Sequence, residues 1–235
     1  MALPAHLLDR FPPELRKNAL LRTADSLERA VEARFPLDSL LGELLGQGGI
    51  VELAQKGGRA LGTSLALRAC AEAQKESLAF SREPSLCGFV DTEGSLYAPG
   101  VLGHEVRLDR LLVARPRPEA LAKTALRMAE ARIFSVLVID IVGSLKEPLE
   151  LYQNSWVRLV RRLAHTIEGS NTLILLLTDS STRAAVPLPT HERLELSRVG
   201  SREILARRTR SRRGVIGASL RLELPSPRGE ELLAS

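Results

Sequence analysis

Aromatic residues and cysteines are scarce in this chain of 235 residues. Phe, Trp and Tyr together make up 3% of it, and cysteine occurs only at Cys70 and Cys87. Two cysteines are too few for a disulfide scaffold, and their spacing with the four histidines matches no zinc site. We therefore expect two buried, reduced thiols and no bound metal.

Long apolar runs and targeting signals are also missing. The longest apolar run, around Leu173 to Leu177, is far too short to span a bilayer. The first ten residues lack the basic start, the apolar stretch and the small-residue cleavage site of a signal peptide. These features predict a cytoplasmic protein that makes no contact with a membrane.

The charge is nearly balanced, apart from one basic segment late in the chain. The sequence has 33 basic and 28 acidic residues, mostly interspersed, so the net charge of +5 alone implies no polyanionic partner. The basic segment could neutralise the phosphates of DNA, contact an acidic protein surface, or form the solvated tip of a hairpin. No aromatic residue follows Trp156, so the segment has no platform for stacking bases, and we expect DNA binding to be weak or absent. Its arginines are Arg207, Arg208, Arg210, Arg212 and Arg213.

Apolar strands and amphipathic helices alternate through most of the chain. Continuous apolar strands separated by helices are typical of a mostly parallel sheet that is buried on both faces. After His191 the pattern changes to short antiparallel strands with turns at Gly200 and Gly214. The predicted fold class is therefore α/β, with a mostly parallel central sheet, antiparallel C-terminal strands and an N-terminal helix. The expected strands cover residues 50–54, 86–90, 111–114, 134–139 and 172–177, and the expected helices cover 65–75, 118–132 and 149–167.

Three segments flank or interrupt this alternation. Residues 1–34 are expected to hold a helix whose apolar stripe either covers the chain's own sheet or contacts a partner. A glycine-rich connection is expected to lead from there to the first strand, and residues 225–235 are expected to form a loose tail. The stripe consists of Leu15, Ala19, Leu27 and Val31, and the connection contains Gly42, Gly46, Gly48 and Gly49.

Polar motifs follow three of the predicted strands. In a sheet of this kind a ligand binds outside the carboxyl ends of the strands. Gly57, Gly62 and Ser64 follow the first strand with the spacing Gly-x4-Gly-x-Ser, close to the phosphate loop Gly-x4-Gly-Lys-[Ser/Thr]. Asp91 with Glu93 follows a second strand, and Asp140 ends a third, where a magnesium-associated carboxylate would be expected.

The phosphate-loop motif lacks its lysine. Thr63 occupies the lysine position when residues are counted forward from Gly57, and Gly62 occupies it when they are counted back from the next helix. A phosphate loop uses the lysine to neutralise charge between the β- and γ-phosphates. A glycine-rich turn also has a purely structural use between a strand and a helix. We therefore expect no ATP hydrolysis and no cofactor.

Four segments resemble the ATPase core of RecA in their order and spacing. They are similar to the strand that enters RecA's nucleotide loop, the segment with its catalytic glutamate, its magnesium-site strand, and the entry to the strand before its second DNA-binding loop. Within residues 35–224 the resemblance implies a RecA-like core, in which Glu93 would activate water and Asp140 would hold the magnesium shell. The four segments are residues 49–53, 89–93, 136–140 and 170–173.

Departures from RecA point to a narrower resemblance. Besides the missing lysine, Thr178-Asp179 stands where the sensor glutamine is expected, and residues 180–190 replace the glycine-rich DNA loop. A RecA-like core with a damaged phosphate loop is similar to the ImuA family. Its members accompany ImuB and an error-prone C-family DNA polymerase in SOS-induced translesion synthesis. The resemblance implies an accessory protein without chemistry of its own, which binds RecA, restrains its filament, and binds ImuB.

Two other functions stay open at the level of the sequence. One is a working ATPase of the RecA or KaiC type with an unusual phosphate loop, against which the missing lysine argues. The other is a DNA-binding module that uses the arginine-rich hairpin, against which the lack of aromatic residues argues weakly. RecA packs its N-terminal helix on the neighbouring protomer, so the resemblance implies the same use for residues 1–34.

Overall fold

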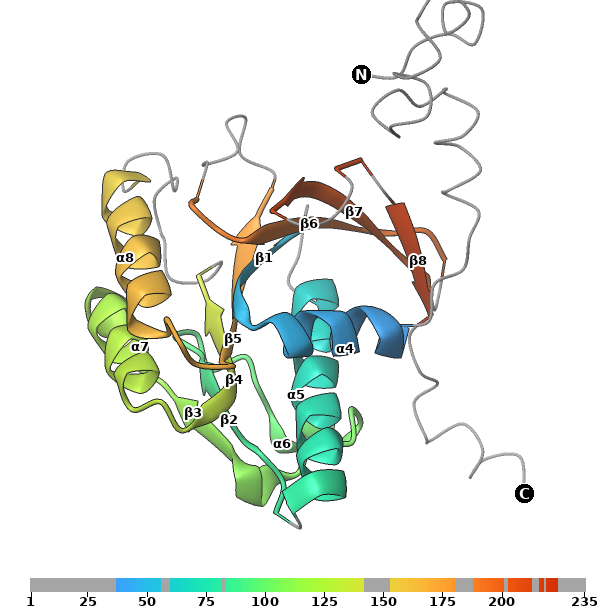
Figure 1. The fold of residues 1–235 in the computed structure, drawn as a ribbon, viewed down its shortest axis with the longest axis horizontal. Coiled ribbons are helices and arrows are strands. Elements are labelled where there is room, and N and C mark those ends of the chain that lie inside the picture. The colour runs from blue at the N-terminus through green and yellow to red at the C-terminus, as the bar shows by residue number, and fades with distance from the viewer. Residues whose placement is uncertain are drawn as a thin grey trace, which may run out of the picture.

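The fold was analysed in a computed structural model of the chain (Figure 1). It describes residues 37–55, 60–81, 83–141, 153–180, 188–200, 203–212, 216–217 and 219–223. The predicted N-terminal helix with Leu15, Ala19, Leu27 and Val31, the tail at 225–235, and both Gly57 and Arg213 lie outside these residues. Among the helices described, none combines the length and the apolar character needed to cross a membrane.

A single mixed sheet of eight strands forms the centre of the molecule. Its order is β3-β2-β4-β5-β1-β6-β7-β8. The first six strands in the chain pair in parallel with their neighbours, and β7 and β8 then add in antiparallel fashion, which confirms the predicted α/β class with a mostly parallel sheet. The strands are β1 (Gly49–Gln55), β2 (Leu86–Val90), β3 (Leu111–Ala114), β4 (Phe134–Asp140), β5 (Leu173–Asp179), β6 (Glu192–Arg198), β7 (Glu203–Ser211) and β8 (Ser219–Glu223).

The helices follow the predicted alternation, with one correction. The glycine-rich connection expected at Gly42 and Gly46 is a helix, because Leu40, Leu41 and Leu44 bury one side of it in the core while the two glycines face solvent. The helices are α4 (Leu37–Gln47), α5 (Ala60–Ser81), α6 (Ala98–Leu102), α7 (Leu121–Glu130) and α8 (Gln153–Thr166), with 3-10 turns η1 (Leu108–Arg110) and η2 (Pro118–Ala120).

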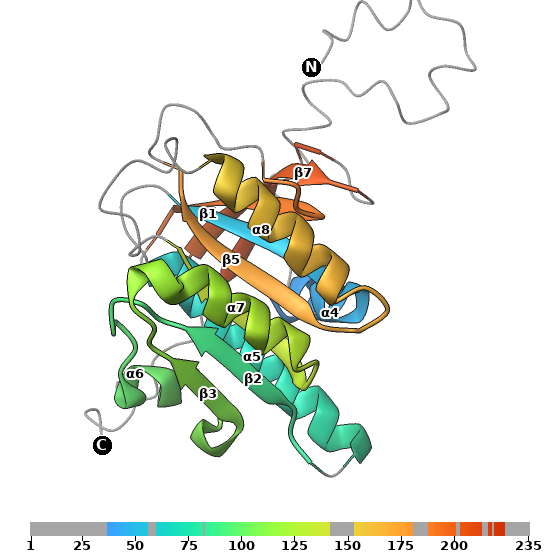
Figure 2. The ribbon, with the colours of Figure 1, turned by 90° about the vertical axis from the view of Figure 1, so that its left-hand side faces the viewer.

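Helices cover both faces of the parallel part of the sheet. On one face α4 and α5 pack on a core that runs from Cys87 and Phe89 in β2 to Leu194 in β6. On the other face α7 and α8 lie side by side, and Trp156 of α8 is buried in their core (Figure 2). This layered arrangement explains why the strands are apolar on both faces. Cys70 and Cys87 are free and buried in the first core, as the sequence predicts.

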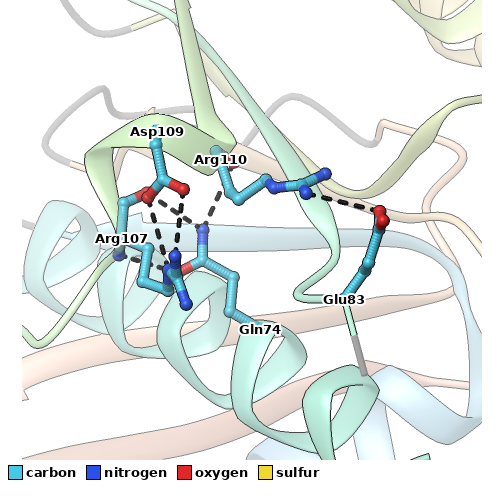
Figure 3. Close-up of polar contacts among 5 residues, drawn as sticks. All are labelled: Gln74, Glu83, Arg107, Asp109 and Arg110. Carbon is cyan, nitrogen blue, oxygen red and sulfur yellow. Dashed lines mark hydrogen bonds and ion pairs between the residues drawn. The ribbon is translucent and has the colours of Figure 1, made fainter. Parts of the chain in front are cut away.

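A buried amide on α5 positions the edge strand β3 (Figure 3). Gln74 is 3% exposed, and its Nε2 donates to the carbonyl oxygens of Arg107 and Arg110, each at 3.3 Å. Its Oε1 accepts the N–H of Arg107 at 2.8 Å. An ion pair between Arg110 and Glu83 at 3.3 Å lies beside this contact. Gln74 thereby satisfies backbone groups of the turn η1 that lead directly into β3.

Candidate functional site

The carboxyl ends of four neighbouring strands meet at the start of α5. Asp140 is the last residue of β4, Asp179 of β5 and Gln55 of β1, and Asp91 follows β2 directly. Alternation along each strand turns these four side chains toward the sheet face that α4 and α5 cover. The fold therefore gathers the predicted strand-end carboxylates at the place where a nucleotide site was expected.

A glutamine side chain caps α5 where a phosphate would bind. The N–H of Gly62, the third residue of α5, donates to Oε1 of Gln55 at 2.9 Å. N–H groups in the first turn of a helix have no acceptor within the helix and form the usual site for a phosphate. Gln55 is only 2% exposed, and within the described residues its Nε2 has no hydrogen-bond partner. An anion at this amide would have to displace the chain's own side chain.

Asp91 organises the loop that carries Glu93. Its fully buried carboxylate accepts hydrogen bonds from the N–H of Ser95 at 3.1 Å and of Leu96 at 3.0 Å. Arg115 approaches the same carboxylate at 3.6 Å and also donates to the carbonyl oxygen of Leu96 at 2.7 Å. These contacts hold Asp91 in a structural role and leave Glu93 exposed at the tip of the turn.

The other predicted nucleotide-site residues lie close by in the fold. Thr63 and Ser64 are half-buried in the first turns of α5, and Asp140 is 2% exposed. Gly57 lies outside the described residues. Among the residues that the structure describes, no group of three or more His, Cys, Asp or Glu side chains could hold a metal ion.

A buried ion pair that the sequence analysis missed lies on the opposite face of β1. Oε1 of Glu52 accepts hydrogen bonds from Nη1 of Arg193 at 2.7 Å and from Oγ1 of Thr178 at 2.9 Å. Burial raises the pKa of Glu52, and the charge of Arg193 partly opposes this shift. The sequence held one signal for this pair, which is the presence of Glu52 within an apolar strand. Its partner Arg193 could not be identified in the same way, because it lies 141 residues away.

The predicted basic patch is divided between two faces of the sheet. Arg208 faces the α4 side, where it is 8% exposed and forms ion pairs with Glu192 and Glu43. Burial raises the pKa of Glu192, against the opposing charge of Arg208. Arg207 points to the other face and is exposed. The five arginines therefore do not form one continuous surface.

Two more of these arginines have separate surroundings. Arg210 donates to the carbonyl oxygen of Leu188, on the same face as the Glu52–Arg193 pair. Arg212 lies at the far end of β7, beside a cavity of about 200 Å³ that His191 and Glu192 also line. Arg213 lies outside the described residues. A cooperative phosphate-binding cluster would need these side chains on one face.

Apolar side chains are exposed at the β3 edge of the sheet. Tyr97, Leu102, Leu108 and Leu112 have between 41% and 67% of their surface exposed. They belong to α6, η1 and β3 or lie directly beside them, and these elements are neighbours in the fold (Figure 2). Within the described residues no strand pairs with the outer side of β3. A combination of exposed apolar groups and an open sheet edge is a common interaction surface.

Comparison of the chain with protein-family models and with curated proteins gives no match.

Proposed function

We propose that this chain is a RecA-like accessory protein of SOS-induced, error-prone translesion DNA synthesis that has no ATPase activity. It acts in the cytoplasm by binding RecA, whose filament it restrains, and by binding ImuB, and through them it serves an error-prone C-family DNA polymerase. The partners and the pathway come from the resemblance to the ImuA family. The α/β core with its mixed eight-stranded sheet is compatible with that resemblance.

The hydrogen bond from Gly62 to Gln55 carries the non-catalytic part of this proposal. It occupies an amide that would otherwise be available to a phosphate, in a loop whose sequence already lacks the lysine. Stabilising the charge that develops on the γ-phosphate is worth several kcal/mol in working enzymes. Asp91 also supports a non-catalytic role, since its carboxylate accepts hydrogen bonds from N–H groups of its own loop. We infer that the strand-end carboxylates are structural.

A steady-state ATPase assay with single-stranded DNA present tests this inference. We expect turnover no higher than that of the Glu93→Gln variant, because the loop lacks the lysine that would hold the γ-phosphate and the N–H of Gly62 is bonded to Gln55. Glu93 is exposed, so the variant should fold normally and is a fair control. ATP turnover that disappears in Glu93→Gln would show that the site is active and would favour the alternative of a RecA or KaiC type ATPase.

A capture experiment tests the proposed partners. Immobilised chain should retain RecA and ImuB from the same organism, and added chain should slow RecA filament assembly as followed by light scattering. The exposed apolar edge at β3 supports an interaction role. Removing a large apolar side chain such as Leu112 from water in an interface makes binding more favourable. Failure to retain either protein, with a chain shown to be folded, would contradict the proposal.

A further inference from the structure

Helix α8 has an apolar side that packs on the sheet and a basic side that faces solvent. The apolar side includes the buried residues Trp156, Val160 and Leu163. The charged residues of the other side recur at positions i, i+3, i+4 and i+7, so they lie in one row along the helix. No residue of α8 is acidic. We call this row the α8 basic stripe: Arg158, Arg161, Arg162 and His165.

The stability of the fold does not account for the α8 basic stripe. Like charges that are three and four residues apart on a helix repel one another. The helix dipole favours a cation in the last turn, where His165 lies, but not further from the C-terminus, at Arg158. Among the residues that the structure describes, Arg161 and Arg162 form no ion pair. Because apolar side chains hold α8 on the sheet, the stripe is better explained by a ligand of opposite charge.

Helix α7 extends the positive charge over the same side of the molecule. The two helices lie side by side on one face of the sheet, and both face the viewer in Figure 2. Lys123 and Arg127 lie one turn apart on the exposed side of α7, and neither has an ion pair within the described part of the chain. The described carboxylates lie toward the helix ends, with Glu119 before α7, Glu130 at its last residue and Glu168 after α8. Lys123, Arg127 and the α8 basic stripe together form what we call the α7–α8 basic face.

We propose that the α7–α8 basic face binds the phosphate backbone of a nucleic-acid duplex. Arg158 and Arg162 are one helical turn apart, about 6 Å along the axis, so neighbouring cations of the stripe can contact successive phosphates of one strand. Guanidinium groups offer forked N–H donors that suit phosphate oxygens. Contacts of this kind position a protein on a duplex without reading its sequence. The inference goes beyond the proposed function and does not depend on it.

The α7–α8 basic face differs from the other segments for which DNA contact was considered. It includes neither the C-terminal arginines, for which we expect weak DNA binding, nor residues 180–190, which stand at the position of the DNA loop of RecA. Its charges project from two helices that are packed on the sheet, so their backbone positions are fixed before a ligand binds. Less conformational entropy is therefore lost on binding.

The composition of this face favours a duplex over an acidic protein segment. Protein interfaces usually have an apolar or aromatic anchor near their centre, and charged residues are depleted there. Among the described residues of α7 and α8, no large apolar side chain is exposed, although Ile133 is exposed after the end of α7. Binding to the backbone of a duplex needs cations and no aromatic platform, because the bases stay stacked on each other.

Fluorescence anisotropy with the full chain tests this inference. The probes are a labelled DNA duplex, an RNA duplex of the same length and a glutamate-rich peptide, each measured between about 50 and 200 mM salt. We expect a duplex to bind more tightly than the peptide, with an affinity that falls steeply as salt is added. Arg161→Gln with Arg162→Gln should weaken duplex binding at least about tenfold and should lower the slope of log K against log salt by about two.

A matched control separates this face from the C-terminal arginines. Arg207→Gln with Arg212→Gln makes the same change in net charge at two exposed residues, one in β7 and one directly after it. This control should bind the duplex like the original chain. Absent duplex binding at the lowest salt, or an equal loss in the control, would overturn the inference. Tighter binding of the peptide than of either duplex would overturn it in favour of an acidic protein.

A further variant should change the affinity in the opposite direction, which misfolding cannot imitate. Glu130→Gln removes a carboxylate from the exposed side of α7 and should tighten duplex binding severalfold, because less charge then repels the phosphates. Duplex binding that does not tighten in Glu130→Gln would show that the ligand lies elsewhere and would overturn the inference.

Discussion

At the residue scale, Gln55 links the end of a strand to the start of a helix. It ends the central strand β1 and, through 2.9 Å from its Oε1 to the N–H of Gly62, it satisfies a donor at the start of α5. This cap comes from the strand before the helix. The N–H of Gly62 thus has an acceptor within the chain itself.

Replacement of this glutamine should lower the stability of the fold. Gln55→Ala leaves the buried N–H of Gly62 without its acceptor, and we expect the free energy of unfolding to fall by about 1–3 kcal/mol. Urea denaturation measures this change. Gln47→Ala is the matched control, since Gln47 is exposed and its Nε2 donates to Glu43 on the same helix, so its effect should stay within about 0.5 kcal/mol. Equal losses in the two variants would contradict the role assigned to Gln55.

His104 should make stability depend on pH. Burial, followed by the positive charge of Arg68, lowers the pKa of His104 below its ordinary value of 6.5. As the pH falls below about 6.5, the unfolded chain takes up a proton at His104 before the folded chain does, so stability decreases. The pH-dependent loss between pH 7.5 and 5.5, from urea midpoints, should be smaller in His104→Gln. His165→Gln is the control, since His165 is 88% exposed on α8.

If the free energy of unfolding falls equally between pH 7.5 and 5.5 in the original chain and in His104→Gln, this prediction is wrong. A general loss of stability in His104→Gln would not, because only the difference between the two pH values tests the titration.

Contacts between neighbours in sequence could be predicted from the residues, while distant polar contacts could not. The positions of Asp91 and Asp140 followed from where apolar runs end, which is a local property. The partner of Glu52 is Arg193, on a strand that the chain reaches 141 residues later. Sequence alone did not show which strand would lie beside β1, so the buried pair became visible only in the fold.

Helix α4 shows how packing overrides local propensity at the scale of an element. Gly42 and Gly46 lower helix propensity, which is why a loop was predicted. Leu40, Leu41 and Leu44 are at most 2% exposed, and their burial outweighs that cost. The helix ends at Gln47, and the φ of +59° at the following Gly48 suits the residue after a helix C-terminus.

A substitution in α4 should therefore stabilise the protein. Gly42→Ala restores helix propensity at an exposed position with no atom within 4 Å of the added Cβ, and we expect a gain of about 0.5–1 kcal/mol. Thermal and urea unfolding measure the gain. Gly48→Ala should have the opposite effect, because it combines a positive φ with a Cβ 3.3 Å from the backbone of Asn171. A loss of stability in Gly42→Ala would show that other parts of the chain contact this side of α4.

The parallel strands were easier to predict than the C-terminal extension. Strands buried on both faces are continuous apolar runs, so β1, β2, β4 and β5 stood out in the sequence. Strands β6 to β8 are buried on one face and alternate with arginines, so their residues first suggested a basic hairpin. Their register decides which arginines share a face, and a bulge near Arg193 shifts that register between Arg208 and Arg210.

At the scale of the whole molecule, the sheet offers two different surfaces at its two ends. The β3 edge exposes apolar side chains, and the β6–β8 end exposes Arg207 and Arg212. A protein that joins two partners needs separate surfaces for them, because one surface cannot hold both at once. The candidate nucleotide site lies between these two ends, at β1 and β4, where Gln55 accepts the N–H of Gly62.

The N-terminal segment gives the last prediction, which concerns how the chain would restrain a RecA filament. A filament grows through a heterologous interface that repeats, so a protomer mimic that offers one face without ATP would stop growth. If Leu15, Ala19, Leu27 and Val31 form the contacting stripe, Leu15→Asp with Leu27→Asp should abolish capture of RecA while the chain stays folded. If these leucines instead cover the chain's own sheet, the same double change should unfold it, since charged side chains are costly in a core. Circular dichroism and RecA capture on one preparation distinguish the two outcomes, and a folded double variant that still captures RecA and still slows filament assembly would show that the stripe is not the RecA contact.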